Sequence, residues 1–143
     1  MTTDFSIRHF GIVVKDLEAS LFFYRHLLGF EVFKKAHESG TEISTFLGIE
    51  NVAVTTLKMR NQFNQMIELL HYKKQVYNND IFINQLGPTH IALSVSNLDN
   101  LYQKFKNQNI EFISSPTVTN NKFAKVAFCK APEGTFIELV EEL

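Results

Sequence analysis

Two histidines and two glutamates occupy matching positions in the two halves of this 143-residue chain. His9 and His90 each begin an apolar segment, and they stand 81 positions apart. The sequence Ile-Glu-Leu occurs around Glu68 and again, 70 positions later, around Glu138. Imidazole nitrogens and carboxylate oxygens together suit Zn, Ni, Co, Fe or Mn. The four residues therefore suggest the binding of one divalent metal ion.

The surroundings of the glutamates point the same way. Glu68 and Glu138 each interrupt a short apolar segment that alternation predicts to be a strand. A carboxylate in apolar surroundings without compensation is costly or becomes protonated. Two neutral imidazoles and two carboxylates around a divalent cation have no net formal charge, so a metal ion removes this cost.

Each residue taken alone has an ordinary structural explanation. A single His on a strand is usually a hydrogen-bonded core or surface residue. A single Glu usually faces solvent or pairs with a basic residue, and Arg8 and Lys125 are available. All four residues could thus be purely structural. The metal site is favoured because both kinds of residue recur in matching register.

Other candidate residues are weaker. His26 and His37 are expected to be solvated, and His71 alternates with Glu68 and so should point away from it. Tyr72 shares the face of Glu68 and could reach a substrate or pack at the rim. The sequence contains no nucleophile motif, phosphate-binding glycine loop or CxxC pair.

The elements expected to position these residues occur in the order βαβββ, twice. Apolar patterns predict strands in the first half over residues 5–14, 30–33, 52–59 and 66–72. In the second half they predict strands over residues 90–95, 110–113, 123–129 and 136–140. Asp16 and Asn97 are expected to begin the two helices, and Gly29 to end the first. A turn is expected over residues 131–134, with Pro second and Gly fourth.

The repeat defines the domain organisation. We expect a single domain, with one module over residues 5–72, a linker over 73–87 and a second module over 88–143. Each module is too small to be stable alone, so the two should pack together. The first half carries extra residues, which we place at 38–51.

Composition excludes several classes of function. Hydrophobic residues make up 45% of the chain and the net charge is −1, with scattered basic residues and no basic patch for nucleic acid. No apolar segment is long enough to span a membrane, and the N-terminus lacks signal-peptide features. Cys129, the single cysteine, is expected to be a buried structural thiol and suits the reducing cytoplasm.

The segment that begins at His9, His-Phe-Gly-Ile-Val-Val-Lys-Asp-Leu-Glu-Ala-Ser-Leu-Phe-Phe-Tyr-Arg-His-Leu-Leu-Gly-Phe, resembles the opening of vicinal oxygen chelate proteins. This superfamily includes glyoxalase I, methylmalonyl-CoA epimerase, extradiol dioxygenases, fosfomycin-modifying enzymes and bleomycin-binding proteins. Segments 89–95 and 131–140 resemble its second half. The resemblance implies an α+β fold in which two tandem βαβββ modules form a curved mixed sheet around a metal-binding cavity. It also implies that the ligands come from the first and last strands of each module, here His9, Glu68, His90 and Glu138.

The sequence departs from the family pattern at two places. The turn before the last strand usually has Asp where this chain has Ala131, which should affect the turn and not the metal. The extra residues 38–51 reshape one edge of the expected cavity, so the substrate of close relatives does not transfer directly.

Within the superfamily, four protein ligands favour a glyoxalase I-like isomerase or lyase that acts on a small substrate with vicinal oxygens through an enediolate. The implied cofactor is one divalent ion, Ni, Zn, Co, Mn or Fe, and the proton-transferring residues would be Glu138 first and Glu68 second. The alternatives are an epimerase of an acyl thioester, an extradiol dioxygenase and a non-catalytic small-molecule-binding protein. A homodimer is expected because dimers are usual in the superfamily.

Overall fold

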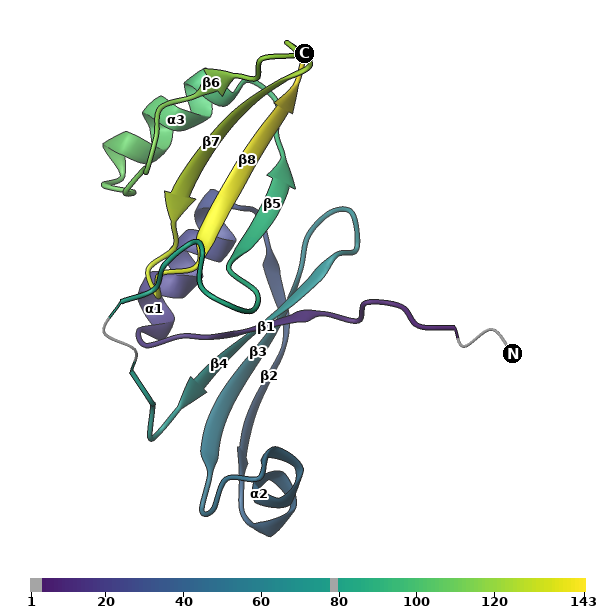
Figure 1. Cartoon of the computed structure of the whole chain (residues 1–143). Helices are drawn as coiled ribbons and strands as arrows, with labels where there is room; N and C mark the ends of the chain where they lie inside the picture. The colour runs from purple at the N-terminus through teal and green to yellow at the C-terminus, as the bar shows by residue number, and fades with distance from the viewer. Residues whose placement is uncertain (1–3, 78–79) are drawn as a thin grey trace. The chain divides into compact units, whose positions relative to one another are not determined.

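The computed structural model describes residues 4–77 and 80–143, which fall into two compact units, residues 1–77 and 78–143 (Figure 1). The first unit contains β1 (Phe10–Val13), α1 (Leu17–Leu21), the π-helical turn η1 (Phe22–Leu27), β2 (Glu31–Ser39), α2 (Thr41–Leu47), β3 (Ala53–Arg60) and β4 (Met66–Tyr72). The second contains β5 (His90–Ser94), α3 (Leu98–Asn107), β6 (Thr117–Val118), β7 (Ala124–Lys130) and β8 (Phe136–Glu142).

Both units have the same sheet topology. The strand orders are β1-β4-β3-β2 and β5-β8-β7-β6. In each sheet the first strand of the unit pairs in parallel with the last, and the other neighbours are antiparallel. The expected α+β fold with two βαβββ modules is confirmed. This topology puts the strands that carry the predicted ligands side by side.

The core of each unit lies against one face of its sheet. In β3 and β4 the residues that share this face are almost fully buried, and they include Leu57, Met59, Ile67 and Leu69. The equivalent face of the second sheet buries Ala127, Cys129, Ile137 and Leu139. Because side chains alternate along a strand, the opposite face carries His9, Glu68, His90 and Glu138.

The first helix begins and ends where the sequence predicts. The Asp16 carboxylate accepts a hydrogen bond from the backbone N–H of Ala19 at 3.0 Å, which satisfies one of the free donors of the first turn. Gly29 follows the π-helical turn with a φ of +77°, a conformation that glycine adopts without strain.

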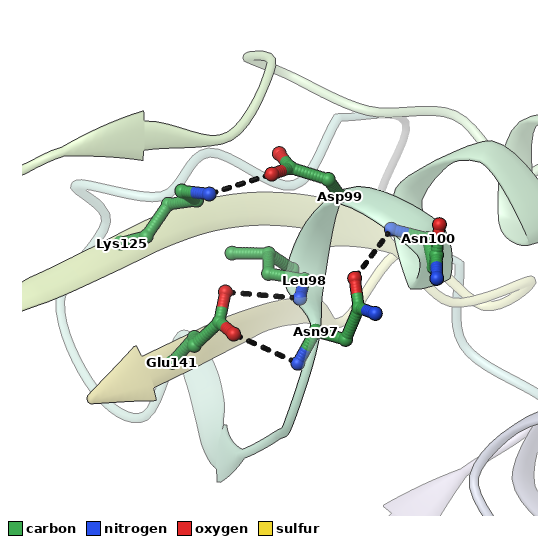
Figure 2. A network of polar contacts seen from close by, with 6 residues as sticks. All are labelled: Asn97, Leu98, Asp99, Asn100, Lys125 and Glu141. Atoms are coloured by element: carbon green, nitrogen blue, oxygen red, sulfur yellow. Dashed lines mark hydrogen bonds and ion pairs between the residues drawn. The ribbon is translucent and has the colours of Figure 1, made fainter. Parts of the chain in front are cut away.

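The start of α3 is capped by two side chains, those of Asn97 and Glu141 (Figure 2). Asn97 caps the helix by accepting from the N–H of Asn100 at 3.3 Å, although its own backbone is left-handed, with a φ of +56°. The Glu141 carboxylate, from the end of β8, accepts from the N–H groups of Asn97 and Leu98 at 2.8 and 3.0 Å. These bonds tie the helix to the sheet and satisfy its first donors with a negative charge, which the helix dipole favours.

Two expectations about the elements were wrong, and one helix was not expected. Strand β1 begins at Phe10, since the apolar residues before it do not pair with β4, and Phe5 is 90% exposed. Residues 110–113 make only one bridge, between Phe112 and Cys129, and the short β6 borders β7 instead. The extra segment 38–51 contains the end of β2 and the helix α2, which apolar periodicity did not predict.

None of the helices in the described ranges has the length and apolar character needed to cross a membrane.

Candidate metal centre

The first pair of predicted ligands meets in the first sheet. Gly11 of β1 lies opposite Glu68 of β4, and His9 precedes Gly11 by two residues, so its side chain projects from the same face. The Nε2 atom of His9 lies 2.9 Å from Oε2 of Glu68. The Glu68 side chain is only 13% exposed and that of His9 29%, so the carboxylate is largely removed from water and has one close cationic or hydrogen-bonding partner.

The second pair repeats this arrangement. Ala92 of β5 lies opposite Glu138 of β8, as Gly11 lies opposite Glu68. The Nε2 atom of His90 is 3.4 Å from Oε2 of Glu138, and both side chains are more exposed than those of the first pair, at 42% and 23%. The structure thus pairs His9 with Glu68 in the first unit and His90 with Glu138 in the second.

The donor atoms of each pair fit a divalent metal. Ligand atoms about 2.1 Å from a metal lie roughly 3.0 Å apart at a right angle and about 3.4 Å apart in a tetrahedron. The separations of 2.9 and 3.4 Å fall in this range. Each pair therefore offers two donors of a suitable type and spacing. Across residues 4–77 and 80–143, no three His, Cys, Asp or Glu side chains form a metal-binding group, so a centre with all four ligands stays a prediction.

Lys125, one of the two basic residues that could have paired with a glutamate, has another partner. The Lys125 ammonium lies 2.6 Å from the carboxylate of Asp99, which is in the first turn of α3 (Figure 2). The hydrogen bond to Asp99 raises the pKa of Lys125. Lys125 also lies on the opposite face of β7 from the side chain that neighbours Glu138.

The remaining histidines lie away from the pairs. His71 is opposite Thr55 on the core face of the sheet, as alternation predicted. His37 is exposed, and its Nδ1 is hydrogen-bonded to Thr55 Oγ1 at 2.8 Å, so it is partnered as well as solvated. His26 is exposed on η1, with its ring 5.7 Å from that of Phe22.

Tyr72 shares the face of Glu68, four residues further along β4. Burial raises the pKa of the Tyr72 hydroxyl, and the negative charges of Glu68 and Glu38 raise it further. Glu38 itself accepts a hydrogen bond from Thr56 at 3.4 Å. Tyr72 therefore stays protonated and can donate a hydrogen bond at neutral pH.

Sequence reasoning missed the residues that lie directly beside the two glutamates on the neighbouring antiparallel strands. Lys58 of β3 is opposite Glu68, whereas Phe128 of β7 is opposite Glu138. The Phe128 ring makes an edge contact with His90, with ring centroids 5.8 Å apart. Only the strand register reveals these neighbours, because residues 58 and 128 carry no motif. The first His–Glu pair thus has a charged neighbour, Lys58, and the second has an aromatic neighbour, Phe128.

Cys129 follows Phe128 but lies on the core face of β7, where it is fully buried, as predicted. Burial raises the pKa of its thiol to about 12. A thiol that stays protonated is a poor nucleophile and a poor metal ligand, so Cys129 has no part in the centre.

Comparison with known proteins agrees with this topology. The chain is 28% identical over 98% of its length to a lactoylglutathione lyase of Schizosaccharomyces pombe, of which it covers 46%, so it spans about half of that protein. It is also 28% identical to a probable lactoylglutathione lyase of Synechocystis, with 93% of this chain and 92% of the relative covered. A glyoxalase family protein from Bacillus cereus has a similar fold, with a TM-score of 0.88 at 19% identity, over 99% of this chain and 97% of that one.

The sequence model of one family covers almost the whole chain, from residue 6 to residue 139. That range includes both His–Glu pairs and the strands that carry them, except the last three residues of β8. The chain therefore belongs to the Glyoxalase/Bleomycin resistance protein/Dioxygenase superfamily.

Proposed function

We propose that His9, Glu68, His90 and Glu138 together hold one divalent metal ion, Ni, Zn, Co, Mn or Fe, and that the protein is a glyoxalase I-like isomerase or lyase. The observation that carries the proposal is the recurrence of a His–Glu pair at the same register in both sheets. Four protein ligands are the pattern of glyoxalase I-like members. The lactoylglutathione lyases among its relatives support the same branch.

When bound, a divalent cation would act as a Lewis acid toward two adjacent oxygens of the substrate. The two histidines would remain ligands throughout. A carboxylate would remove the proton α to the substrate carbonyl and return it to the neighbouring carbon. The substrate expected from this chemistry is a small α-hydroxycarbonyl compound, such as the adduct of an α-ketoaldehyde with a thiol.

Glu138 is better suited than Glu68 to carry the proton. The Glu138 carboxylate is the more exposed of the two and lies further from its histidine, at 3.4 Å against 2.9 Å. Its neighbour on β7 is the apolar side chain of Phe128, which offers the Glu138 carboxylate no competing ion pair. Glu68, which is less exposed and closer to its histidine, is the better fixed ligand.

The test is an activity assay of the metal-loaded chain with the hemithioacetal of methylglyoxal and glutathione, the product being followed as a thioester. We expect turnover that chelator treatment abolishes and added metal restores. If the metal-loaded protein never turns the hemithioacetal over, and binds it equally well before and after chelation, the protein is instead a non-catalytic binding protein. We expect the active species to be a homodimer, which sedimentation of the loaded protein would check.

A further inference from the structure

A row of register partners crosses the first sheet at the level of the His9–Glu68 pair. From β1 to β2 the row is Gly11, Glu68, Lys58 and Lys34. Residues directly opposite each other in a sheet project from the same face. Two lysines therefore follow Glu68 on the face that carries the proposed metal ligands.

Neither lysine forms an ion pair with a carboxylate in the part of the chain that the structure describes. The Glu68 carboxylate is taken by His9. Lys58 is only partly exposed, whereas Lys34 is exposed. Like charges directly opposite each other destabilise a sheet. The repulsion between Lys34 and Lys58 therefore lowers the stability of the sheet, and a bound anion would offset it.

A third cation extends this positive surface. Arg60 follows Lys58 by two residues, so it projects from the same face of β3. Its guanidinium lies over the ring of Phe33, 4.5 Å from the ring centroid. Glu31 lies opposite Arg60 in the register, and its carboxylate forms an ion pair with Arg25. Lys34, Lys58 and Arg60 are called the cationic strip below.

The second sheet has no such strip, although its topology is the same. Phe128 takes the place of Lys58 beside the second glutamate. The position equivalent to Arg60 is Lys130, which forms an ion pair with Glu111 at 3.0 Å. Among the described residues, positive charge outside the ion pairs therefore lies beside only the first of the two His–Glu pairs, as expected for a substrate whose two ends differ.

We propose that the cationic strip binds an anionic group of the substrate, and that the substrate class is a vicinal-oxygen compound that also carries a carboxylate. The inference rests on the proposed metal site, because the strip adjoins Glu68. The carboxylate would lie over Lys58 and Lys34, and the adjacent oxygens would face the His–Glu pairs. The strip thereby determines specificity and orientation and takes no part in the proton transfer.

The test is a binding measurement on the Co(II)-loaded full chain, whose visible absorption reports on chelation by a hydroxamate. Two hydroxamates of matched length are compared, butyrohydroxamate and succinate monohydroxamate, which differ only in a terminal methyl or carboxylate. We expect the carboxylated compound to bind about 10-fold more tightly, since two charge-assisted contacts are gained at a partly exposed site. The preference should shrink as the ionic strength is raised to about 1 M, because salt screens exposed charges.

The variant K34M/K58M tests whether these two lysines recognise the carboxylate, because methionine keeps an apolar side chain of similar length and removes the charge. We expect its preference for succinate monohydroxamate to fall to about 1-fold, with butyrohydroxamate binding unchanged. The control K104M/K106M removes two exposed charges from α3 and should keep the preference. Thermal unfolding of K34M/K58M should occur at or above the wild-type temperature, since a like-charge pair is removed.

Three results would overturn the inference, and they differ from one another. Equal affinity of the two hydroxamates for the wild-type protein would show that the strip does not recognise carboxylate. A preference that survives in K34M/K58M would assign it to other residues. If neither hydroxamate changes the Co(II) spectrum, the proposed metal site itself is wrong, and the inference that rests on it is lost as well.

Discussion

The Nε2 atom of His9 lies 2.9 Å from Oε2 of Glu68, and this contact joins the residue directly before β1 to the neighbouring strand β4. The two donors are already at the spacing that two ligands of one metal adopt. The parallel pairing of β1 with β4 sets this spacing, because it places Gly11 opposite Glu68 and His9 next along the strand. Metal binding therefore needs little rearrangement within the pair.

A bound metal should raise the stability of the protein, because the folded chain holds the ligands together and the unfolded chain does not. At a metal concentration about 100 times the dissociation constant, we expect a gain of about 2.7 kcal/mol in the free energy of unfolding. Thermal unfolding with and without Ni or Zn measures the gain. The variant His9→Ala should lose most of it, whereas the exposed His26→Ala should keep it. An equal gain in both variants would contradict the assignment of His9.

Replacing Glu138 by Gln should abolish turnover while the protein retains some metal, because the amide keeps an oxygen donor but cannot accept the substrate proton. Replacing Glu68 by Gln should weaken metal binding and reduce turnover less. Steady-state kinetics and metal content of each variant give the comparison, with Glu142→Gln at the exposed end of β8 as the control. Full activity in Glu138→Gln would remove Glu138 from the role of base.

The Glu141 carboxylate should be worth about 1–3 kcal/mol of folding free energy, since it accepts from two N–H groups at the start of α3 and no other acceptor replaces it in Glu141→Ala. Urea unfolding measures the difference. The neighbouring Glu142→Ala is the matched control and should change stability by less than about 0.5 kcal/mol, as is usual for surface substitutions. Equal effects of the two substitutions would mean that the capping bonds do not stabilise the helix.

Cys129 should resist alkylation in the folded protein. Burial raises the pKa of its thiol to about 12, so almost no thiolate is present near neutral pH. Iodoacetamide at about pH 8 should react with it only after unfolding. The raised pKa also has a consequence for stability: an unfolded thiol ionises near pH 8.5 and the folded one does not, so the free energy of unfolding should be unaffected below that pH and fall as the pH rises toward 12. Rapid alkylation of the native protein would contradict its burial.

The features that could be predicted from the sequence are those that depend on local chemistry or on repetition. Asp16 and Asn97 cap helices because their side chains reach the backbone N–H three residues on. Strand β4 has the predicted bounds because its apolar segment is interrupted only by Glu68 and His71. The repetition of Ile-Glu-Leu placed Glu68 and Glu138 on equivalent strands.

The features that could not be predicted depend on partners distant in sequence. Apolar residues before Phe10 resemble a strand, but no neighbour pairs with them. Lys58 looks like an ordinary strand lysine until the register places it opposite Glu68. Asn97 was expected to cap a helix, yet its left-handed backbone and its bond to Glu141 depend on the end of β8.

The most direct test of the account is the metal content of the purified protein, before and after chelator, beside that of the double variant Glu68→Ala/Glu138→Ala. We predict about one equivalent of Ni, Zn, Co, Mn or Fe per chain in the wild-type protein, removed by chelator, regained on loading and absent from the double variant. A wild-type protein that takes up no metal under any loading condition, or a double variant that binds it equally well, would contradict the proposed centre.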